Sequence, residues 1–272
     1  MRAELCTEPG NPHKKNEDWG AATNRLAVVL DGLTAPGDLG TGCIHDVPWY
    51  VEKLGTSLLA HMTDSSTDLQ TALAAAIESV AAFHAPTCDI SNPGTPSATA
   101  LALRVNGDNV EWLVLADSTI VFDCSDGLHV YTDDRVTRVN REQHDVAVAS
   151  KVGTKEHEQG VSRLVEAQRK IRNTLGGYWV AGADPQAAYE ALSGEIPLSN
   201  FRRAVLMTDG AARLHEFGLA DWKSVLDIVA TSGTRGLITA VRDAELHDPE
   251  GQRWPRYKTS DDATAAYLTF DS

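Results

Sequence analysis

Several short apolar segments of this 272-residue chain lead into or follow an aspartate. The runs LAVVLD, WLVLAD and AVLMTD end at Asp31, Asp117 and Asp209, and Asp261 stands just before the apolar run 264–270. One aspartate at a strand end is usually a turn former or a helix N-cap. The repetition instead indicates a carboxylate cluster, because strands can bring distant parts of a chain to one edge of a sheet.

Carboxylates gathered at one place repel one another, and a bound divalent cation relieves that cost. Oxygen ligands suit Mg²⁺ or Mn²⁺, whereas the imidazole and thiolate ligands that suit zinc are missing from these motifs. The carbonyl of Gly32 can approach a cation closely because glycine has no side chain. Another acidic group, Asn16-Glu17-Asp18, precedes the first apolar run. We therefore expect a magnesium or manganese site.

Two such ions a few ångströms apart have a known chemical use. They lower the pKa of a bridging water, which yields hydroxide near neutral pH, and they neutralise a phosphoryl group under attack. No protein nucleophile is then required, and the chain has no G-x-S-x-G elbow, no P-loop and no cysteine beside an activating motif.

The elements that must position these residues can be read from the apolar pattern. Strands are predicted at 26–30, 99–105, 110–115, 119–122, 204–207 and 264–270. Helices are predicted at 46–62, 67–84, 155–175, 220–230 and 234–246, with Gly233 separating the last two. Asn106-Gly107 indicates a hairpin. The pattern favours an α+β protein in which helices are layered on antiparallel sheets.

One segment is predicted to be irregular, and a second is a candidate flap. The loop 85–97 is rich in Pro, Ser and Asn. The stretch 133–160 is polar and poorly periodic, which indicates a mobile flap. With no internal repeat or linker, residues 1–272 are expected to form one domain.

The acidic motifs resemble, in order, those of the type 2C family of metal-dependent Ser/Thr protein phosphatases. The matching segments are NEDWG at 16–20, VVLDGLTAPG at 28–37, TPSATALALRV at 95–105, WLVLADSTIVF at 112–122, AVLMTDGAARL at 204–214 and TSDDATAAYLTF at 259–270. Each match is weak alone, and together they cover nearly the whole chain.

The resemblance implies a four-layer αββα sandwich, with two antiparallel β-sheets flanked by helices. It implies a metal set in which Asp31 bridges two ions, Gly32 offers its carbonyl, and Asp209 and Asp261 complete the coordination. Glu17 and Asp18 would act through bound waters, and Asp117 would help to hold a third ion. Asp31, Asp209 and Asp18 would be the catalytic residues. Residues 133–180 would correspond to the family's variable flap.

The sequence also departs from the family pattern around the substrate. Leu33-Thr34 stand where the family usually has His-Gly or Met-Gly-Gly, so a histidine that protonates the leaving group is absent there. His13 occupies the place of a phosphate-gripping arginine. Ala116 replaces a usual glycine, and Asp262 a usual asparagine.

Basic residues near the acidic motifs are candidates for phosphate binding. His13 and Lys15 lie just before the first acidic motif, and Arg253, with Arg256 and Lys258, lies just before Asp261. Pairing with surface carboxylates is the competing interpretation. His45 is a candidate general acid, although a lone histidine beside an aspartate is more often structural.

Composition excludes several other classes of protein. The chain carries 24 Lys+Arg against 38 Asp+Glu, a net charge of −14, which disfavours nucleic acid and anionic membranes as partners. The four cysteines, Cys6, Cys43, Cys88 and Cys124, form no CxxC pair, so a structural zinc site is not expected. Scattered thiols and the lack of a signal-like N-terminus indicate a cytoplasmic protein.

Two functions remain open from the sequence. The first is hydrolysis of phosphoserine and phosphothreonine monoesters on proteins, or of small phosphate esters, with two or three Mg²⁺ or Mn²⁺ ions. The second is a pseudophosphatase, a metal-binding regulatory protein with weak or no turnover. The complete set of aspartates favours the first, and the changes at Leu33-Thr34 and His13 favour the second.

Overall fold

The computed structural model describes residues 1–33 and 39–270. Thr34, one of the departures from the family pattern, lies outside the described residues.

Two five-stranded antiparallel sheets form the centre of the molecule. One sheet has the order β1-β10-β9-β6-β7 and the other the order β2-β3-β4-β5-β8. The first comprises β1 (Arg2–Glu8), β10 (Ala263–Thr269), β9 (Phe201–Met207), β6 (Thr119–Cys124) and β7 (Gly127–Tyr131). The second comprises β2 (Asp18–Ala22), β3 (Leu26–Asp31), β4 (Ala100–Asn106), β5 (Asn109–Leu115) and β8 (Leu192–Pro197).

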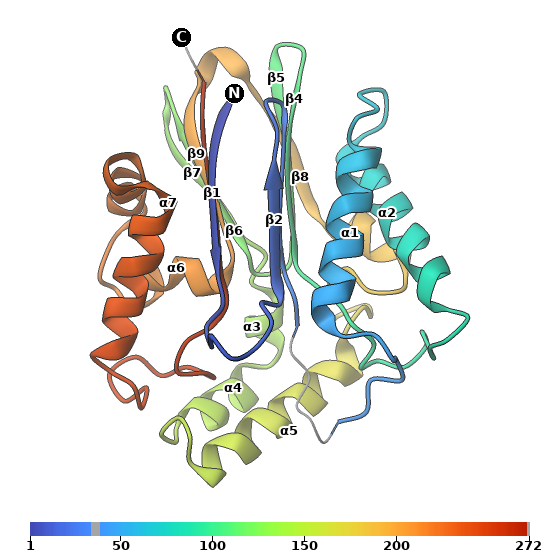
Figure 1. Ribbon diagram of the computed structural model, residues 1–272, viewed down its shortest axis with the longest axis vertical. Coiled ribbons are helices and arrows are strands. Elements are labelled where there is room, and N and C mark those ends of the chain that lie inside the picture. Colours follow the sequence, from blue (N-terminus) through green and yellow to red (C-terminus); the bar gives the residue numbers. More distant parts are fainter. Residues whose placement is uncertain (34–38, 271–272) are drawn as a thin grey trace.

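Helices cover the outer face of each sheet, so the predicted four-layer αββα sandwich is confirmed (Figure 1). α1 (Val47–His61) and α2 (Leu69–His84) pack on the second sheet through a core that includes Leu30, Leu54 and Leu73. α6 (Asp209–Glu216) and α7 (Trp222–Leu246) pack on the first through a core that includes Val205. A third apolar cluster fills the space between the sheets.

Aspartate side chains cap the N-termini of α1, α2 and α7. Asp46 and Asp68 accept hydrogen bonds from the first-turn N–H groups of α1 and α2.

α7 is kinked at Gly233, whose φ of 73° lies in the left-handed region, so the predicted break between two helical stretches is confirmed.

The segment between β7 and β8 forms a helical layer at one end of the sandwich (Figure 1). It contains α3 (Arg135–Val139), α4 (Arg141–Val148) and α5 (Lys155–Ile171), followed by the short 3₁₀ helix η1 (Pro185–Glu190). The segment 133–160, a candidate flap, therefore contains α3, α4 and the start of α5. Its apolar periodicity is weak because α4 buries only Ala147 and α3 buries no residue.

Each predicted strand is present, but four further strands, β1, β2, β7 and β8, and helix α6 were not predicted. β1, β7 and β8 are mostly exposed, so they lack the apolar run that marks the central strands. The short 3₁₀ helix η2 (Leu198–Asn200) joins β8 to β9. The loop 85–97 is irregular, as predicted.

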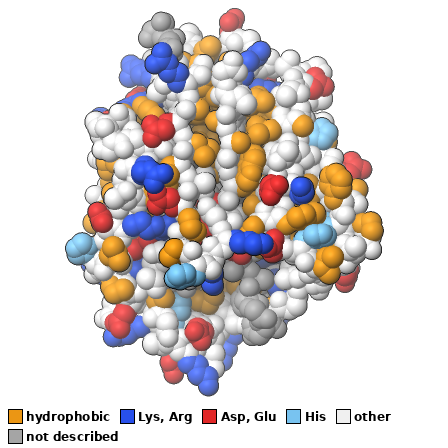
Figure 2. Space-filling view, viewed as in Figure 1, with side chains coloured by type: hydrophobic (Ala, Val, Ile, Leu, Met, Phe, Trp, Pro, Cys, Tyr) orange, Lys and Arg blue, Asp and Glu red, His pale blue; other side chains and the backbone are white. Residues whose placement is uncertain are grey.

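Acidic and basic side chains are interspersed on the face shown in Figure 2, so the negative net charge is not gathered into one acidic surface there. Among the helices of residues 1–33 and 39–270, none has the length and apolarity needed to span a bilayer.

Candidate metal centre

Asp18 and Asp31 are brought side by side by the pairing of β2 with β3, in which they are direct cross-strand partners. The chain then continues through Gly32, whose N–H donates to the Glu17 carbonyl at 3.1 Å. A side chain at this position would collide with Val47 and with the Glu17 carbonyl, which explains why glycine follows Asp31.

Asp209 and Asp261 reach the same place from the other sheet. β9 pairs with β10, and the Thr208 N–H donates to the Thr264 carbonyl at 3.0 Å, which holds the end of β9 against the start of β10. Asp209 begins α6 immediately after this contact. Gly210 lies against the Asp262 carbonyl so closely that any side chain there would overlap it.

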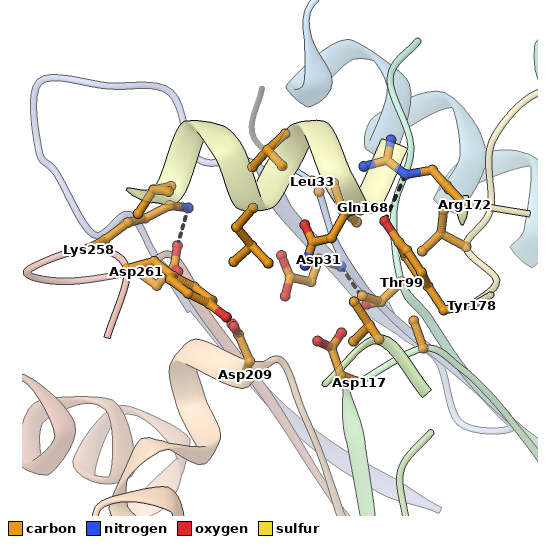
Figure 3. Close-up of a pocket in the computed structure, with 18 of the residues that line it drawn as sticks. Asp31, Leu33, Thr99, Asp117, Gln168, Arg172, Tyr178, Asp209, Lys258 and Asp261 are labelled. Carbon is orange, nitrogen blue, oxygen red and sulfur yellow. Dashed lines mark hydrogen bonds and ion pairs between the residues drawn. The ribbon is translucent and has the colours of Figure 1, made fainter. Parts of the chain in front are cut away.

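The carboxylates meet in one pocket. Asp31, Asp117, Asp209 and Asp261 all line a cavity of about 370 Å³, and the Asp31 and Asp209 carboxyl groups are close enough to share a hydrogen bond. In Figure 3 these side chains lie beneath α5. α5 contributes a wall of mixed character, in which Val161, Leu164 and Val165 are apolar and His157, Glu158, Ser162 and Gln168 are polar.

Burial and mutual repulsion disfavour the charged form of most of these groups. Burial raises the pKa of Asp31 and Asp18 well above the ordinary carboxyl value, and their acidic neighbours raise it further. Burial and the Asp209 carboxylate raise the pKa of Asp117 to about 7. The pKa of Asp209 is raised by burial and by Asp261. A cluster of oxygens whose negative charges oppose one another is suited to binding a divalent cation.

Asp261 is the exception, because cations surround it. Burial opposes its ionisation, but Lys258 and Arg213 lower its pKa below the ordinary value. Lys258 Nζ lies 2.6 Å from Oδ1, and Arg213 lies 3.4 Å from Oδ2. Arg213 is itself buried and pairs with the buried Glu245. Asp261 therefore stays charged with its orientation fixed.

Side chains behind the carboxylates also hold them in place. Thr208 donates its hydroxyl proton to Asp18 Oδ2 at 2.9 Å and accepts the Thr264 N–H at 2.9 Å. Asp262, a departure from the pattern of the family that the sequence resembles, accepts the N–H groups of Gly10 and Glu17 at 2.7 and 2.5 Å. Acceptor oxygens suffice for both bonds, so the aspartate preserves the loop contacts of this position.

Glu17 and Lys15 lie beside the first pocket, in a neighbouring cavity of about 500 Å³ that also reaches Asp261 and Lys258. Lys15 pairs with the exposed Asp46 at 2.7 Å. The two cavities therefore share one wall, formed by Lys258 and Asp261.

The other predicted phosphate-binding residues lie away from the pocket lining. His13 is exposed in the loop before β2. The guanidinium of Arg253 stacks on the Trp254 ring, 4.4 Å from its centroid. Lys258, in the same basic stretch as Arg253, lines the pocket, as does Arg172, which was not predicted. Arg213 also escaped prediction, because a buried arginine within an amphipathic helix has no distinguishing sequence signal.

His45 is likewise not among the residues that line the pocket. It contacts Cys43 and Cys88, and it stacks on Trp49 with ring centroids 3.9 Å apart. Leu33 does line the pocket, where it packs against an apolar cluster that includes Ala116 and Tyr178.

Ala116 has a φ of 68°, in the left-handed region. Glycine adopts this conformation freely, whereas alanine adopts it only at a cost of about 1–2 kcal/mol.

Comparison with solved structures gives the same architecture over the whole chain. The serine/threonine phosphatase PstP/Ppp of Mycobacterium tuberculosis matches with a TM-score of 0.60 and 15% identity, covering 100% of this chain and 99% of that one. Stp1 of Staphylococcus aureus matches at 0.59 and 15%, with 100% and 96% coverage. The PstP catalytic domain in complex with two manganese ions matches at 0.58 and 16%, with 99% and 98% coverage.

No protein-family model and no curated protein matches the sequence. The likeness therefore lies in the arrangement of strands and helices, and it agrees with the order of acidic motifs along the chain. The chain has the fold of the type 2C, or PPM, Ser/Thr protein phosphatases.

Proposed function

We propose that this protein is a metal-dependent phosphatase that hydrolyses phosphoserine and phosphothreonine monoesters. The observation that carries the proposal is that Asp31, Asp117, Asp209 and Asp261, which are far apart in the sequence, line one pocket. The same fold is found in bacterial Ser/Thr phosphatases, one of them in complex with manganese.

The donor set fits Mg²⁺ or Mn²⁺. It consists of carboxylates whose pKa values are mostly raised by burial and by one another, a condition that bound dications relieve. Asp31, Asp209, Asp261 and the Gly32 carbonyl would hold two ions, with Asp18 and Glu17 acting through waters and Asp117 supporting a third. When bound, such ions activate water for attack and neutralise charge on a phosphoryl group.

The protein's own residues would orient this centre and the substrate. Thr208 and Thr264 hold the Asp18 carboxylate, while Arg213 and Lys258 hold Asp261. Lys258 is half-buried at the wall shared by the two cavities, so its ammonium is the cation best placed to attract a phosphate dianion. α5 covers one side of the pocket and limits the access of water from that side.

The pocket volume and its lining favour a small phosphorylated side chain. A cavity of about 370 Å³ accepts phosphoserine or phosphothreonine. Apolar residues of α5 and Leu33 would contact the Cβ end of the phosphorylated side chain. The protein or peptide that carries the phosphate would lie outside the pocket.

The direct test is turnover of a phosphothreonine peptide and of an aryl phosphate by metal-free protein, before and after Mn²⁺ or Mg²⁺ is added. We expect activity only with metal, and we expect Asp209→Asn to reduce kcat by about 10²-fold or more. The matched control is Asp108→Asn, which removes an exposed carboxylate in the β4–β5 turn. Equal turnover with and without metal would refute the proposal.

A second function, metal binding without turnover, is favoured by one observation. Leu33 fills the pocket wall directly after Gly32, and the predicted general acid His45 is not among the lining residues. Isothermal titration with Mn²⁺ separates the two functions, since a pseudophosphatase would bind metal in an Asp209-dependent way and show no hydrolysis.

A further inference from the structure

A second group of potential metal ligands lies apart from the carboxylate pocket. Cys43 and His45 come from the loop before α1, His84 from the last turn of α2, and Cys88 from the loop that follows. Their Sγ and ring-nitrogen atoms all lie within 4.8 Å of one another. None of the four residues lines the carboxylate pocket.

The distances approach those of a tetrahedral metal site. Cys43 Sγ lies 3.5 Å from Nδ1 of His45 and 3.5 Å from Nδ1 of His84, and Cys88 Sγ lies 3.4 Å from Nδ1 of His45. Zinc bonds of about 2.3 Å to sulfur and about 2.0–2.1 Å to nitrogen imply sulfur–nitrogen separations of about 3.6 Å. Three of the contacts therefore already have the required length.

The two sulfur atoms are 2.7 Å apart and both cysteines are free thiols. A tetrahedral zinc ion would set them about 3.8 Å apart, so small side-chain rotations of about 1 Å complete the geometry. The backbone N–H groups of Ile44 and His45 point at these sulfurs, at 3.4 Å each. Such donors stabilise thiolates, which are the form of cysteine that binds metal.

His84 is a completely buried imidazole directed at the cluster. Its Nδ1 faces Cys43, while its Nε2 has no hydrogen-bond partner in the described part of the chain. A metal ion bound at Nδ1 would place the ring proton on Nε2, so it would use the Nδ1 lone pair that faces Cys43 and would not satisfy Nε2. Aromatic rings fix the two imidazoles, since Trp49 stacks on His45 and Tyr50 packs near His84.

We propose that Cys43, His45, His84 and Cys88 form a structural Zn²⁺ site. Two thiolates and two imidazoles in a tetrahedral arrangement are a typical zinc ligand set, whereas the oxygen-lined pocket suits Mg²⁺ or Mn²⁺. All four positions are filled by protein side chains, which leaves no open position for a substrate. The site is therefore structural, and it does not depend on the proposed phosphatase activity.

Zinc would cross-link the loop before α1 to the loop after α2. These two loops contact α5, which forms one wall of the carboxylate pocket. Asp89 N–H already bonds to the Gly42 carbonyl at 2.8 Å, which joins the same two loops. Arg169 of α5 donates to the Gly40 carbonyl at 3.2 Å and packs against Gly94. Arg172, which follows α5, donates to the Pro93 carbonyl at 3.2 Å. The loops thus connect the zinc site to α5.

The first experiment measures metal in the protein as purified without chelator or affinity-tag histidines. We expect about one zinc ion per chain, retained after dialysis against a weak chelator that removes Mn²⁺. Replacement by Co²⁺ should produce the intense visible absorption of tetrahedral cobalt with thiolate ligands. Cobalt bound by carboxylates and water in the other pocket is octahedral and absorbs weakly, so the spectrum identifies the site.

Variants assign the ligands. Cys88→Ser and His45→Ala should each abolish the tetrahedral cobalt spectrum and reduce bound zinc by about 10-fold or more. The matched control is His129→Ala, which removes a histidine from a second group of potential ligands, Cys124, Asp126 and His129, and should leave zinc content unchanged. Asp209→Asn should lose Mn²⁺ binding but keep zinc, which separates this proposal from the phosphatase proposal.

Two results with the wild-type protein would overturn the zinc site. One is wild-type protein that contains no zinc and gives no tetrahedral cobalt spectrum after reconstitution under reducing conditions. The other is a disulfide between Cys43 and Cys88 in the native protein, detected by mass spectrometry of non-reduced peptides after thiol blocking. Zinc that persists in both Cys88→Ser and His45→Ala would also assign the ion elsewhere.

Discussion

The ammonium of Lys258 lies 2.6 Å from Oδ1 of Asp261, and this ion pair forms the wall between two adjoining cavities. Lys258 therefore faces the Asp261 carboxylate on one side and, on the other, a pocket in which a second anion, a phosphate dianion, is expected. Its side chain is 42% exposed, so it can turn toward a bound anion without leaving a buried charge unpaired.

Removing this charge should weaken substrate binding more than it slows the chemical step. At saturating Mn²⁺, we expect Lys258→Met to raise KM for a phosphopeptide by about 10-fold, the value of one charged hydrogen bond. Lys258→Arg should restore much of the loss. Lys223→Met, at an exposed lysine paired with Asp227, is the control. An unchanged KM in Lys258→Met would exclude Lys258 from phosphate binding.

The hydroxyl of Thr208 should matter for metal affinity, although it contacts only Asp18 and the Thr264 backbone. Thr208→Val keeps the shape and removes the hydrogen bond that orients the carboxylate. We expect Mn²⁺ affinity measured by calorimetry to fall by about 10–100-fold. Thr56→Val, at an exposed threonine of α1, should leave the affinity unchanged. Equal affinities in the two variants would show that Thr208 does not position Asp18.

The effect of Asp209→Asn on stability should change sign with metal. Without divalent cations the substitution removes one of several mutually repelling carboxylates, so the melting temperature should rise. With saturating Mn²⁺ it removes a ligand and the melting temperature should fall below that of the wild type. A change of about 1 kcal/mol corresponds to roughly 2–4 °C in Tm. A fall under both conditions would argue against electrostatic strain in the cluster.

Asp248 should stabilise the fold most strongly above its ordinary pKa of 3.8. Burial opposes its ionisation, but N–H groups of Trp254, Arg253 and Gln252 and the Arg256 side chain lower its pKa in the folded protein. A depressed pKa means that the unfolded chain binds the proton first. The stabilisation is therefore complete above that ordinary value and is lost as pH falls through the lower folded pKa.

Urea unfolding across this acid range measures the contribution of Asp248. Asp248→Asn should be destabilised near pH 7 by about 3–5 kcal/mol, because Arg256 is left buried without its carboxylate. The deficit relative to the wild type should shrink as the pH falls below 4. Asp108→Asn carries the same change in net charge and should unfold like the wild type. A deficit independent of pH would contradict the electrostatic account.

Gly233 should tolerate alanine poorly for two reasons. Its φ is 73°, and a side chain there would collide with the Glu4 carboxylate that caps the second half of α7 by accepting from Thr234 at 2.7 Å. We expect Gly233→Ala to destabilise by about 2–3 kcal/mol and Gly218→Ala, at a positive φ with open space around it, by only about 1–2 kcal/mol. Equal losses of unfolding free energy would show that the Glu4 contact adds nothing.

The central strands and outer helices could be predicted from the sequence because their apolar residues repeat with the period of a buried face. LAVVL of β3 and the LALRV of β4 are examples, and the turn Asn106-Gly107 between β4 and β5 marks a hairpin. β1 and β8 escaped prediction because their side chains are mostly exposed, and their strand conformation depends on pairing with β10 and β5.

For the site, the sequence alone determined which carboxylates stand at strand ends, since Asp31, Asp117 and Asp209 each follow an apolar run. Only the tertiary structure decided their cationic neighbours and the second ligand group. Arg213 meets Asp261 through the packing of α6 near the start of β10, whereas Lys258 stands three residues before Asp261 and only the direction of its side chain was left to the fold. Cys43-x-His45 and His84-x₃-Cys88 are two mixed pairs far apart in sequence, and their meeting depends on the packing of α1 and α2, which no local spacing encodes.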